Sequence, residues 1–339
     1  MFLRSRLFFA VCALFCLLLF SCQKRASRYG TESTIVVIAD DQDWQKIEGI
    51  VRETFEQEYF TPQPEKVFVI QRITPDELSR YSRWRNICIF ATLQTSGKVG
   101  ELVNSILPHR DRVRVDQDSS FVFRKIDPWA SGQLLLLVVA KNMPTLQEQI
   151  KKNQELLFYL FDEHASNLVS KEMLPNAKSK ELADKLGAEY GWKIQIQRDF
   201  FEAVNSPQDH FVWLRRLNPQ RWIFVYWQKV EDPSLLNEEW MINTRNRLAE
   251  KYYQGDVIIN KFNKVQDVDF LGNYAIRLDG HWENDSLNVG GAFREYGFYS
   301  QSSERLYLID MAVYSPGERK LQYIRQLDAI AHTFHEVKQ

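Results

Sequence analysis

Strand and helix patterns alternate along the chain from residue 33 onwards, and this alternation limits the fold more than any other feature. Residues 34–39, Thr-Ile-Val-Val-Ile-Ala, form a continuous apolar run that is typical of a strand buried on both faces. Over 44–55 the apolar residues recur at spacings of three and four, which predicts a helix with one apolar face. The chain is therefore expected to have an α+β fold.

Further elements follow from the same patterns. Strands are predicted at 67–72, 86–92, 121–125, 134–140, 273–282 and 305–313. Helices are predicted at 97–107, 145–165 and 235–252, and after the capping pattern Ser315-Pro316-Gly317-Glu318.

The two parts of the chain repeat a similar order of elements. Ile70-Gln71-Arg72 recurs as Ile196-Gln197-Arg198, each closing a short predicted strand. Each part ends with a strand, a proline and a helix-capping pattern. We therefore expect an internal duplication with two similar halves, 33–168 and 169–339, each a mainly antiparallel sheet packed against helices.

The N-terminus has the form of a lipoprotein signal peptide. Two arginines precede an uninterrupted apolar run over 7–20, which is shorter than the roughly 20 residues that span a bilayer. The run ends at Ser21-Cys22, which resembles the lipobox of bacterial lipoproteins, whose cysteine is diacylated before cleavage. We expect residues 1–21 to be the signal peptide and 22–32 a lipidated tether. An ordinary cleaved signal and a short membrane anchor are the alternatives.

The positions of the four cysteines leave no disulfide within the mature chain. Cys12 and Cys16 lie in the signal peptide, and Cys22 would carry the lipid. Cys88 stands between apolar residues, so we expect a buried, inert thiol.

The predicted lipid on Cys22 makes the membrane a partner of the chain. Gln23 follows the cysteine, where an inner-membrane retention signal of the enteric type would have Asp. The resemblance to that sorting rule implies an outer-membrane lipoprotein that faces the periplasm.

Charge and motif content narrow the classes of function. The chain has 43 Lys and Arg against 44 Asp and Glu, so it lacks the basic excess by which proteins neutralise nucleic-acid phosphates. It contains no Gly-x-x-x-x-Gly-Lys-Ser/Thr, Gly-x-Gly-x-x-Gly, His-Glu-x-x-His or Gly-x-Ser-x-Gly motif. We therefore expect no nucleic-acid partner, no cofactor and no metal.

Asp279, His281 and Glu283 are the remaining candidates for catalysis. Side chains two apart on a strand share a face, so these three could converge on a divalent metal or act as acid and base. The interpretation that we favour is the polar end of a strand that enters a turn.

Three other polar groups have structural explanations. Asp40-Asp41-Asp43 would cap a helix, and His332 and His335 would finish the C-terminal helix. Arginines alternate with other residues over 110–115, which predicts an edge strand with a solvated basic face. A basic ligand patch is the alternative there.

Aromatic residues are numerous and are expected mainly in the core. A groove for a sugar, peptide or lipid is the alternative for one group: Trp222, Tyr226, Trp227, Tyr296, Phe298 and Tyr299. Arg85, Trp282 and Arg294 are candidate ligand-binding residues, provided that the fold brings them into one pocket.

Short motifs along nearly the whole mature chain occur in a recognisable order. They are Pro62-Gln63-Pro64-Glu65 with Phe68, Arg85-Asn86-Ile87, Gly290-Gly291-Ala292-Phe293-Arg294 with Tyr296, Tyr314-Ser315-Pro316-Gly317 and Thr333-Phe334. Together they resemble a family of uncharacterised lipoproteins from Bacteroidota-type bacteria, a domain of unknown function. Ala292 stands where that pattern has proline. The resemblance implies lipidation and an envelope location, and it transfers no catalytic residue.

We interpret the chain as a membrane-anchored envelope lipoprotein of unknown molecular function, and as a non-enzymatic module that binds an envelope protein or another ligand. A metal-dependent or hydrolytic enzyme that acts on envelope material through Asp279, His281 and Glu283 is the alternative. A structural module of a larger complex is a third hypothesis.

Cys22→Ala should abolish lipidation and leave an unprocessed precursor, because the thiol is the atom that accepts the diacylglycerol. Metabolic labelling with a radioactive fatty acid and intact-mass measurement check this. Normal lipid-modified, mature protein from the variant would refute the lipobox assignment.

Overall fold

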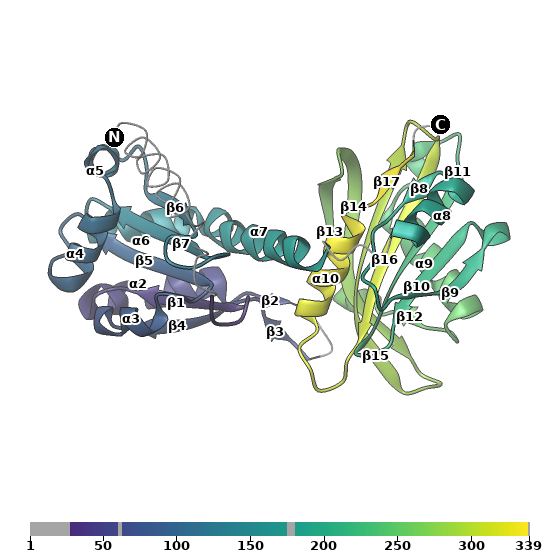
Figure 1. Cartoon of the computed structure of the whole chain (residues 1–339), viewed down its shortest axis with the longest axis horizontal. Helices are drawn as coiled ribbons and strands as arrows, with labels where there is room; N and C mark the ends of the chain where they lie inside the picture. Colours follow the sequence, from purple (N-terminus) through teal and green to yellow (C-terminus); the bar gives the residue numbers. More distant parts are fainter. Residues whose placement is uncertain (1–27, 60–62, 175–179, 338–339) are drawn as a thin grey trace, which may run out of the picture. The chain divides into compact units, whose positions relative to one another are not determined.

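The computed structural model describes residues 28–59, 63–174 and 180–337, which form two compact units (Figure 1). The first unit comprises the described residues up to Val51 together with Ile70–Asn153. The second comprises Arg52–Val69 and the described residues from Gln154 onwards. The predicted signal peptide, Cys22 and most of the tether lie outside the described residues. Within the described ranges, no helix is long and apolar enough to cross a membrane.

The first unit is built on a five-stranded sheet with the order β4-β1-β5-β7-β6. Its strands are β1 (Thr34–Ile38), β4 (Val69–Ile73), β5 (Asn86–Thr92), β6 (Val122–Ile126) and β7 (Leu134–Ala140). Its helices are α2 (Asp41–Phe55), α3 (Leu78–Tyr81), α4 (Gly97–Ile106), α5 (His109–Asp116) and α6 (Met143–Lys152). A 3₁₀ turn, Pro75–Glu77, precedes α3.

The central strands of the first unit are buried as their apolar runs predict. Every residue of β5 and β7 is buried, and so are the apolar residues of α2 that recur at helical spacing. Cys88 lies within β5 with no exposed surface, and burial raises the pKa of its thiol. A thiol with a raised pKa forms little thiolate, which is the inert state expected from the sequence.

Strand direction in the first unit differs from the expected mainly antiparallel sheet. β1 pairs with β5 and β5 with β7 in parallel, whereas β6 pairs with β7 in the antiparallel direction. The physical reason is connectivity: helices join the parallel strands, and a crossover helix returns the chain to the same end of the sheet. The α+β class and the two-part arrangement are confirmed.

Residues 110–115 form a helix, so the predicted edge strand there is wrong. α5 begins after Pro108, and Asp111 contacts Arg114 at 3.4 Å across one helical turn. Val115 is buried, whereas Arg110 is exposed. An alternating pattern over only six residues does not distinguish a strand from a short helix with one buried residue.

The second unit contains a larger sheet with the order β12-β14-β15-β16-β11-β10-β9, and β13 also pairs with β14. These strands are β9 (Phe201–Ser206), β10 (Phe211–Arg216), β11 (Gln220–Lys229), β12 (Val257–Ile258), β13 (Lys264–Phe270), β14 (Asn273–Asn284), β15 (Val289–Ser300) and β16 (Arg305–Tyr314). The pairings β9-β10, β10-β11, β11-β16, β15-β16, β14-β15, β13-β14 and β12-β14 are antiparallel.

The other elements of this unit are helices and two short pairs of strands. The helices are α7 (Gln154–Met173), α8 (Lys180–Tyr190), α9 (Glu238–Tyr252) and α10 (Leu321–Ala331). The short strands are β2 (Glu58–Tyr59) with β3 (Glu65–Lys66), and β8 (Trp192–Lys193) with β17 (His335–Glu336). 3₁₀ turns lie at Pro207–Asp209, Pro233–Leu235 and Asn260–Phe262.

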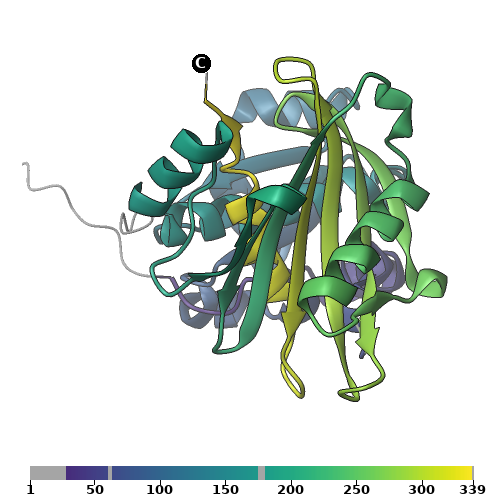
Figure 2. The same cartoon turned by 90° about the vertical axis from the view of Figure 1, so that its right-hand side faces the viewer.

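Both faces of the large sheet are covered by helices. Figure 2 looks onto the face that carries α9, and α10, in yellow, lies behind the strands. Met241 and Leu248 of α9 pack with Phe224, whereas Ile324 and Leu327 of α10 belong to the core on the opposite face. Along each strand, alternate side chains therefore enter two different cores. We name these the α9 face and the α10 face.

The two units do not share a topology, so the structure does not support the expected duplication. The first has parallel central strands, and the strands of the large sheet in the second pair in the antiparallel direction. Ile70-Gln71-Arg72 lies in β4, whereas Ile196-Gln197-Arg198 lies outside any strand. The similarity of these short motifs reflects local patterns rather than a repeated fold.

Helix boundaries differ from the predictions at three places. The region 145–165 contains the end of α6 and most of α7, and Asn142 caps α6 by accepting from the Thr145 N–H at 3.0 Å. The boundary predicted after residue 168 falls inside α7, which belongs to the second unit. The last helix starts at Leu321 rather than at the Ser315–Glu318 pattern, and it ends before His335.

Three charged side chains are fully buried between α9 and the sheet. Arg245 Nε contacts Asp310 Oδ1 at 2.9 Å, and both side chains have no exposed surface. Glu295 lies directly opposite Asp310 on β15, is equally buried, and neither of its oxygens accepts a hydrogen bond from any described residue. Burial and the nearby Asp310 raise the pKa of Glu295 well above its ordinary value, and burial raises the pKa of Asp310 to about 6.

Glu295→Gln should increase the free energy of unfolding at neutral pH by about 1 to 3 kcal/mol, because it removes a buried acid that has no hydrogen-bond partner. An acid whose pKa is raised in the folded state destabilises the fold at pH values where the unfolded chain has released its proton. The gain should therefore shrink as pH falls towards the ordinary Glu pKa of about 4.3, where Glu295 is protonated in the unfolded chain as well.

Urea unfolding curves from pH 4 to pH 8 measure this difference. Glu283→Gln is the matched control, because Glu283 is an exposed glutamate on the neighbouring strand β14. A loss of stability in Glu295→Gln at neutral pH would contradict the prediction.

Candidate functional site

The second unit contains a cavity of about 470 Å³ on the α10 face of its sheet. Its lining comes from α7, α10, β13, β14, β15 and the chain around β2 and β3. The volume lies within the roughly 300–1,000 Å³ that is usual for small-molecule sites. Charged and aromatic side chains line it together, including Tyr59, Tyr159, Phe262, Asp279, Arg294 and Asp328.

Asp279 of β14 is the centre of the charge network in this cavity. Arg294 stands directly across from it on β15, and the Arg294 Nε lies 2.7 Å from Asp279 Oδ1. Arg277, two residues away on the same strand face, places its Nε 2.9 Å from Asp279 Oδ2. The Tyr59 hydroxyl donates to Asp279 Oδ1 at 2.9 Å. One buried carboxylate thus holds three side chains from three strands.

The surroundings keep Asp279 ionised although it is only 7% exposed. Burial by itself would raise the pKa of this carboxyl group. The guanidinium groups of Arg294 and Arg277, with the hydrogen bonds from Arg294 and Tyr59, outweigh burial and hold the pKa below its ordinary value. Asp279 therefore keeps its negative charge, and its partners hold the carboxylate in one position in the cavity.

Asp328 of α10 extends the network to the helix. Arg294 Nη1 lies 3.4 Å from Asp328 Oδ2, and the Tyr296 hydroxyl donates to Asp328 Oδ1 at 2.7 Å. His332 Nδ1 lies 2.8 Å from the Asp328 carbonyl oxygen, at the end of α10. Arg294 therefore bridges a strand carboxylate and a helix carboxylate.

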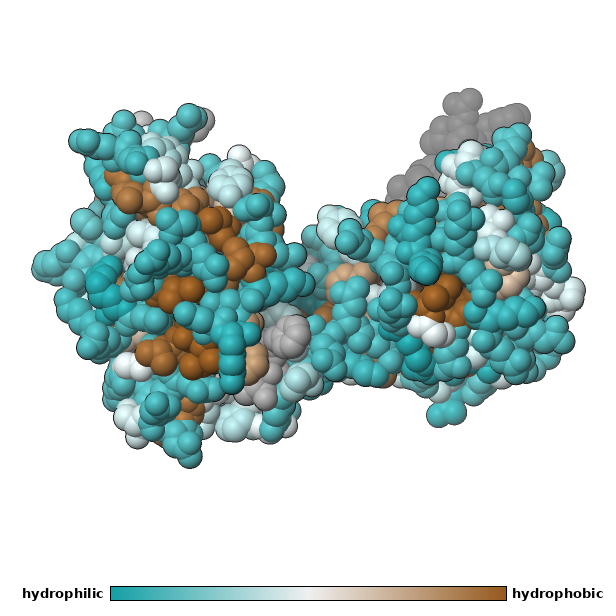
Figure 3. All heavy atoms as spheres, turned by 180° about the vertical axis from the view of Figure 1, so that it is seen from behind, coloured by the Kyte–Doolittle hydropathy of each residue, from teal (hydrophilic) through white to brown (hydrophobic). Residues whose placement is uncertain are grey.

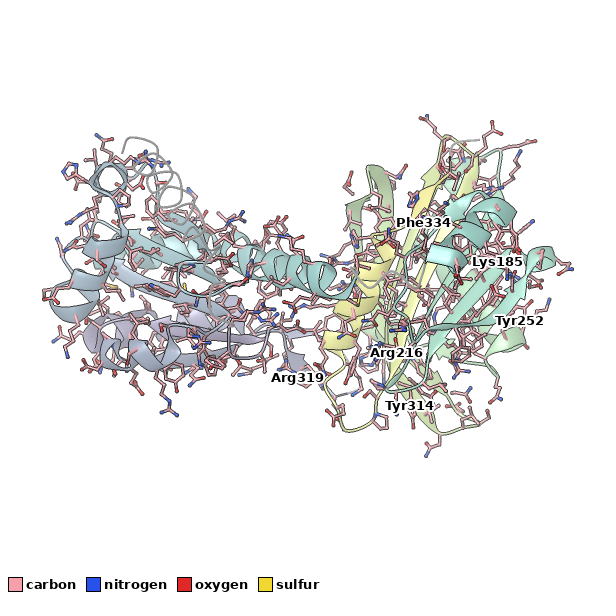
Figure 4. The ribbon with its side chains drawn as sticks, in the orientation of Figure 1. Lys185, Arg216, Tyr252, Tyr314, Arg319 and Phe334 are labelled. Atoms are coloured by element: carbon pink, nitrogen blue, oxygen red, sulfur yellow. The ribbon has the colours of Figure 1, made fainter. Side chains whose placement is uncertain are left out.

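Two further contacts hold the walls of the cavity in place. Arg325 of α10 pairs with Asp162 of α7 at 2.5 Å. At the start of α10, Glu65 of β3 accepts from the backbone N–H groups of Lys320 at 2.7 Å and Leu321 at 3.2 Å. Arg319, labelled in Figure 4 just before this helix, lies 3.7 Å from the same carboxylate. A carboxylate at a helix N-terminus satisfies free N–H groups and the helix dipole.

The three candidate catalytic residues lie on one strand face but have separate surroundings. Asp279 enters the cavity and pairs with arginines. His281 is buried and packs against Phe262 at a ring distance of 4.5 Å. Glu283 is exposed and lies opposite Val257 of β12. In the part of the chain that the structure describes, no group of three or more His, Cys, Asp or Glu side chains could hold a metal ion.

The three candidate ligand-binding residues do not meet. Arg294 lines the cavity, and Trp282 lies on the α9 face of the same sheet. Arg85 belongs to the first unit, where its Nη1 lies 3.9 Å from Glu32 Oε2. Of this group, the cavity contains Arg294 alone.

The proposed aromatic groove is not formed. Trp222, Tyr226, Trp227 and Phe298 are at most 7% exposed and belong to the two cores, and of these four Trp222 also lines a cavity on the α9 face. Tyr296 lines the cavity through its contact with Asp328, and Tyr299 lines a different one. In the view of Figure 3, hydrophilic side chains cover most of the surface and apolar ones form separate patches.

Sequence reasoning missed Tyr59, Asp162 and Asp328. Tyr59 contacts Asp279 across 220 positions of the chain, a separation that no local pattern encodes. Arg277 carried a usable signal, because it stands two residues before Asp279 on a predicted strand and must share its face.

Two family models match this chain, and both describe domains of unknown function. Residues 29–174 match the domain of unknown function DUF8532, and residues 179–333 match the domain of unknown function DUF4837. The two parts of the chain therefore match different models, in agreement with their different topologies. Comparison with curated proteins finds no match.

Several solved structures resemble part of the fold at low identity. A Bacteroides thetaiotaomicron protein shares 8% identity over 44% of this chain and 47% of its own length, with a TM-score of 0.27. LpqN, involved in cell envelope biogenesis of Mycobacterium tuberculosis, shares 8% identity over 43% of this chain and 83% of its own length, with a TM-score of 0.29. The Saccharomyces cerevisiae Ran-binding protein Mog1p shares 14% identity over 43% of this chain and 90% of its own length, with a TM-score of 0.29. TM-scores this low transfer no role to this chain.

Asp279→Asn should lower the free energy of unfolding at neutral pH by about 3 kcal/mol, because it leaves the half-buried Arg277 without its counter-charge and Arg294 with Asp328 alone. Wild-type Asp279 stabilises the fold above the ordinary Asp pKa, and this contribution is lost as pH falls through the lower pKa of the folded state. The difference between variant and wild type should therefore shrink below about pH 4.

Urea unfolding from pH 3 to pH 7 measures the difference. Asp267→Asn on β13 is the matched control, since Asp267 is an exposed aspartate whose replacement should change stability by less than about 0.5 kcal/mol. A difference that stays constant over this pH range would contradict the prediction.

Proposed function

We propose that this chain is a lipid-anchored binding module of the cell envelope, and that the cavity around Asp279 and Arg294 binds its ligand without catalysing a reaction. The observation that carries the proposal is the cavity itself, about 470 Å³ in volume and lined by a buried, mutually neutralising charge network. Such a network is already oriented before a ligand arrives, which lowers the cost of binding.

The chemistry of the lining favours a polar or charged ligand. Carboxylate and guanidinium groups both line the cavity, and the rings of Tyr59, Tyr159 and Phe262 offer flat apolar surface beside them. A ligand with both donors and acceptors can pair with this lining without leaving a buried charge unpaired.

The hydrolytic alternative has less support from the same geometry. A general base works best with a pKa near the working pH. Two arginines hold the pKa of Asp279 below its ordinary value, so it is a weak proton acceptor. His281 and Glu283 lie in other surroundings than Asp279.

The envelope location rests on the N-terminal pattern. A thioether-linked diacylglycerol and an N-acyl chain on Cys22 would supply three acyl chains, and two already suffice for stable anchoring. We propose that the anchor holds the chain in the outer membrane with both units facing the periplasm. Density-gradient separation of the two membranes, followed by protease treatment of intact cells, tests this placement.

Native mass spectrometry of the chain, extracted from the envelope that contains it, should show a bound small molecule. Arg294→Gln should lose that molecule, because Arg294 bridges both carboxylates of the network. Tyr59→Phe removes one hydroxyl and should retain the fold while weakening binding.

Arg216→Gln is the matched control, since Arg216 (Figure 4) pairs with Asp199 at 2.6 Å outside the cavity lining. A bound molecule that persists equally in Arg294→Gln would contradict the proposal. Conversion of the recovered molecule during incubation with the chain would favour the enzymatic alternative.

A further inference from the structure

A second cavity, of about 310 Å³, lies on the α9 face of the same sheet. Its lining comes from β10, β11, β14, β16, the turn that joins β14 to β15, and the end of α9. β14 serves both cavities, because Asp279 and Trp282 differ by an odd number of positions and enter opposite faces. The second cavity is therefore separate from the charge network around Asp279.

Aromatic rings form most of its wall. Trp213 lies 4.3 Å from Tyr253 between ring centroids, and Trp222 lies 5.2 Å from Trp282. Tyr252 and Tyr314, labelled in Figure 4, complete the lining from α9 and from the end of β16. Rings of this kind supply flat apolar surface with polar edges.

Buried donors without acceptors are concentrated in this wall. The indole N–H groups of Trp213, Trp222 and Trp282 and the hydroxyl of Tyr253 have no hydrogen-bond partner among the described residues. All four side chains are at most 7% exposed. A buried donor that lacks an acceptor costs free energy, so four around one cavity call for an explanation. A bound ligand with hydrogen-bond acceptors would explain them, because it would pair with these donors.

A carboxylate and a guanidinium group complete the lining. Asp256 is 4% exposed, and its Oδ1 accepts from the Asn284 amide at 2.9 Å. Arg215 lies over the Trp213 ring at 4.7 Å and donates to Gln220 Oε1 at 3.3 Å. The cavity therefore offers acceptor sites as well as donors.

The composition of this wall discriminates between classes of ligand. The unpaired N–H groups of the wall and Arg215 disfavour a cation, although aromatic rings alone would accept one. Asp256 disfavours an anion. A neutral ligand with many hydroxyl groups fits both requirements, because a hydroxyl accepts from an indole N–H and donates to a carboxylate at the same time.

We propose that the cavity bounded by Trp213, Trp222, Trp282, Tyr253 and Asp256 binds a neutral sugar ring, a hexose or an N-acetylhexosamine. The apolar face of the sugar lies against the aromatic rings, and its hydroxyl or acetamido oxygens accept from the unpaired donors. This site is independent of the Asp279 cavity, so either can fail without the other.

Gly291 maintains the shape of this wall. A Cβ atom at this position would lie 2.8 Å from Trp282 Nε1 and 1.9 Å from the Val313 carbonyl oxygen. No side chain fits there, which allows the Trp282 ring to lie directly over the backbone of β15. The Gly290-Gly291 pair therefore has a packing role at the proposed sugar site.

An unpaired indole alone does not define a site. Trp192 is fully buried on the α10 face, and its N–H also lacks a partner within the described residues. It lines neither of the two cavities. Trp192 is therefore the matched control for the three tryptophans of the second cavity, because it is also buried and unpaired but lies outside the cavity lining.

The test is a titration of the purified full chain, labelled with ¹⁵N at tryptophan, with N-acetylglucosamine and with glucose as probes. The indole N–H signals of Trp213, Trp222 and Trp282 should shift in a saturable way, and that of Trp192 should not. Tryptophan-to-phenylalanine variants assign the signals. Choline and inorganic phosphate are titrated in parallel as a cation and an anion.

Trp282→Phe keeps a ring and removes one donor, so it should raise the Kd for the bound sugar about fivefold. Asp256→Asn leaves all rings in place and should also raise the Kd, which keeps the test decisive if the tryptophan variant folds poorly. Trp192→Phe should leave the Kd unchanged.

Saturable shifts of the cavity indoles by either sugar, weakened by Trp282→Phe or Asp256→Asn, support the proposal. Absence of saturation by both sugars overturns it. Shifts caused only by choline or phosphate overturn it in favour of a charged ligand. Sugar binding that neither variant weakens places the sugar elsewhere and overturns it as well.

Discussion

The alternation of side chains along β14 and β15 is the constraint on which the second unit depends. Helices cover both faces of this sheet, so each strand must satisfy two cores with a period of two residues. Asp279 and Arg294 enter the α10 face together because they stand opposite each other in the ladder. A shift of one residue in register would exchange the charged network and the aromatic wall.

Buried charge is handled differently on the two faces. Around Asp279, two arginines and a tyrosine hydroxyl compensate one carboxylate, and the network lines a cavity. Between α9 and the sheet, Arg245 forms an ion pair with Asp310. The neighbouring Glu295 accepts no hydrogen bond from any described residue. Compensated charge suits recognition, whereas uncompensated charge weakens a fold.

The sequence predicted the parts of the molecule that local patterns encode. The runs that became β1, β5 and β7 are continuous and apolar, and the buried positions of α2 recur at helical spacing. Strand direction was not predictable in this way, because it depends on how the connections cross the sheet. The residues 110–115 show the same limit on a small scale, since their brief alternation suits a strand and a helix equally well.

For the site, the two-residue period of a strand placed Asp279 among the candidates, and Arg294 belongs to one of the short motifs. The partners Tyr59 and Asp328 come from distant parts of the chain, and only the folded sheet and α10 bring them to the network. Trp282 was grouped with Arg294 because the sequence does not show that they lie on opposite faces.

The buried group of Arg245, Asp310 and Glu295 links folding of the second unit to the proton content of its surroundings. The folded state raises the pKa of both carboxyl groups, whereas an unfolded chain would release those protons in weakly acidic solution. Folding there is accompanied by proton uptake. The second unit should thus be more stable in slightly acidic solution than at neutral pH.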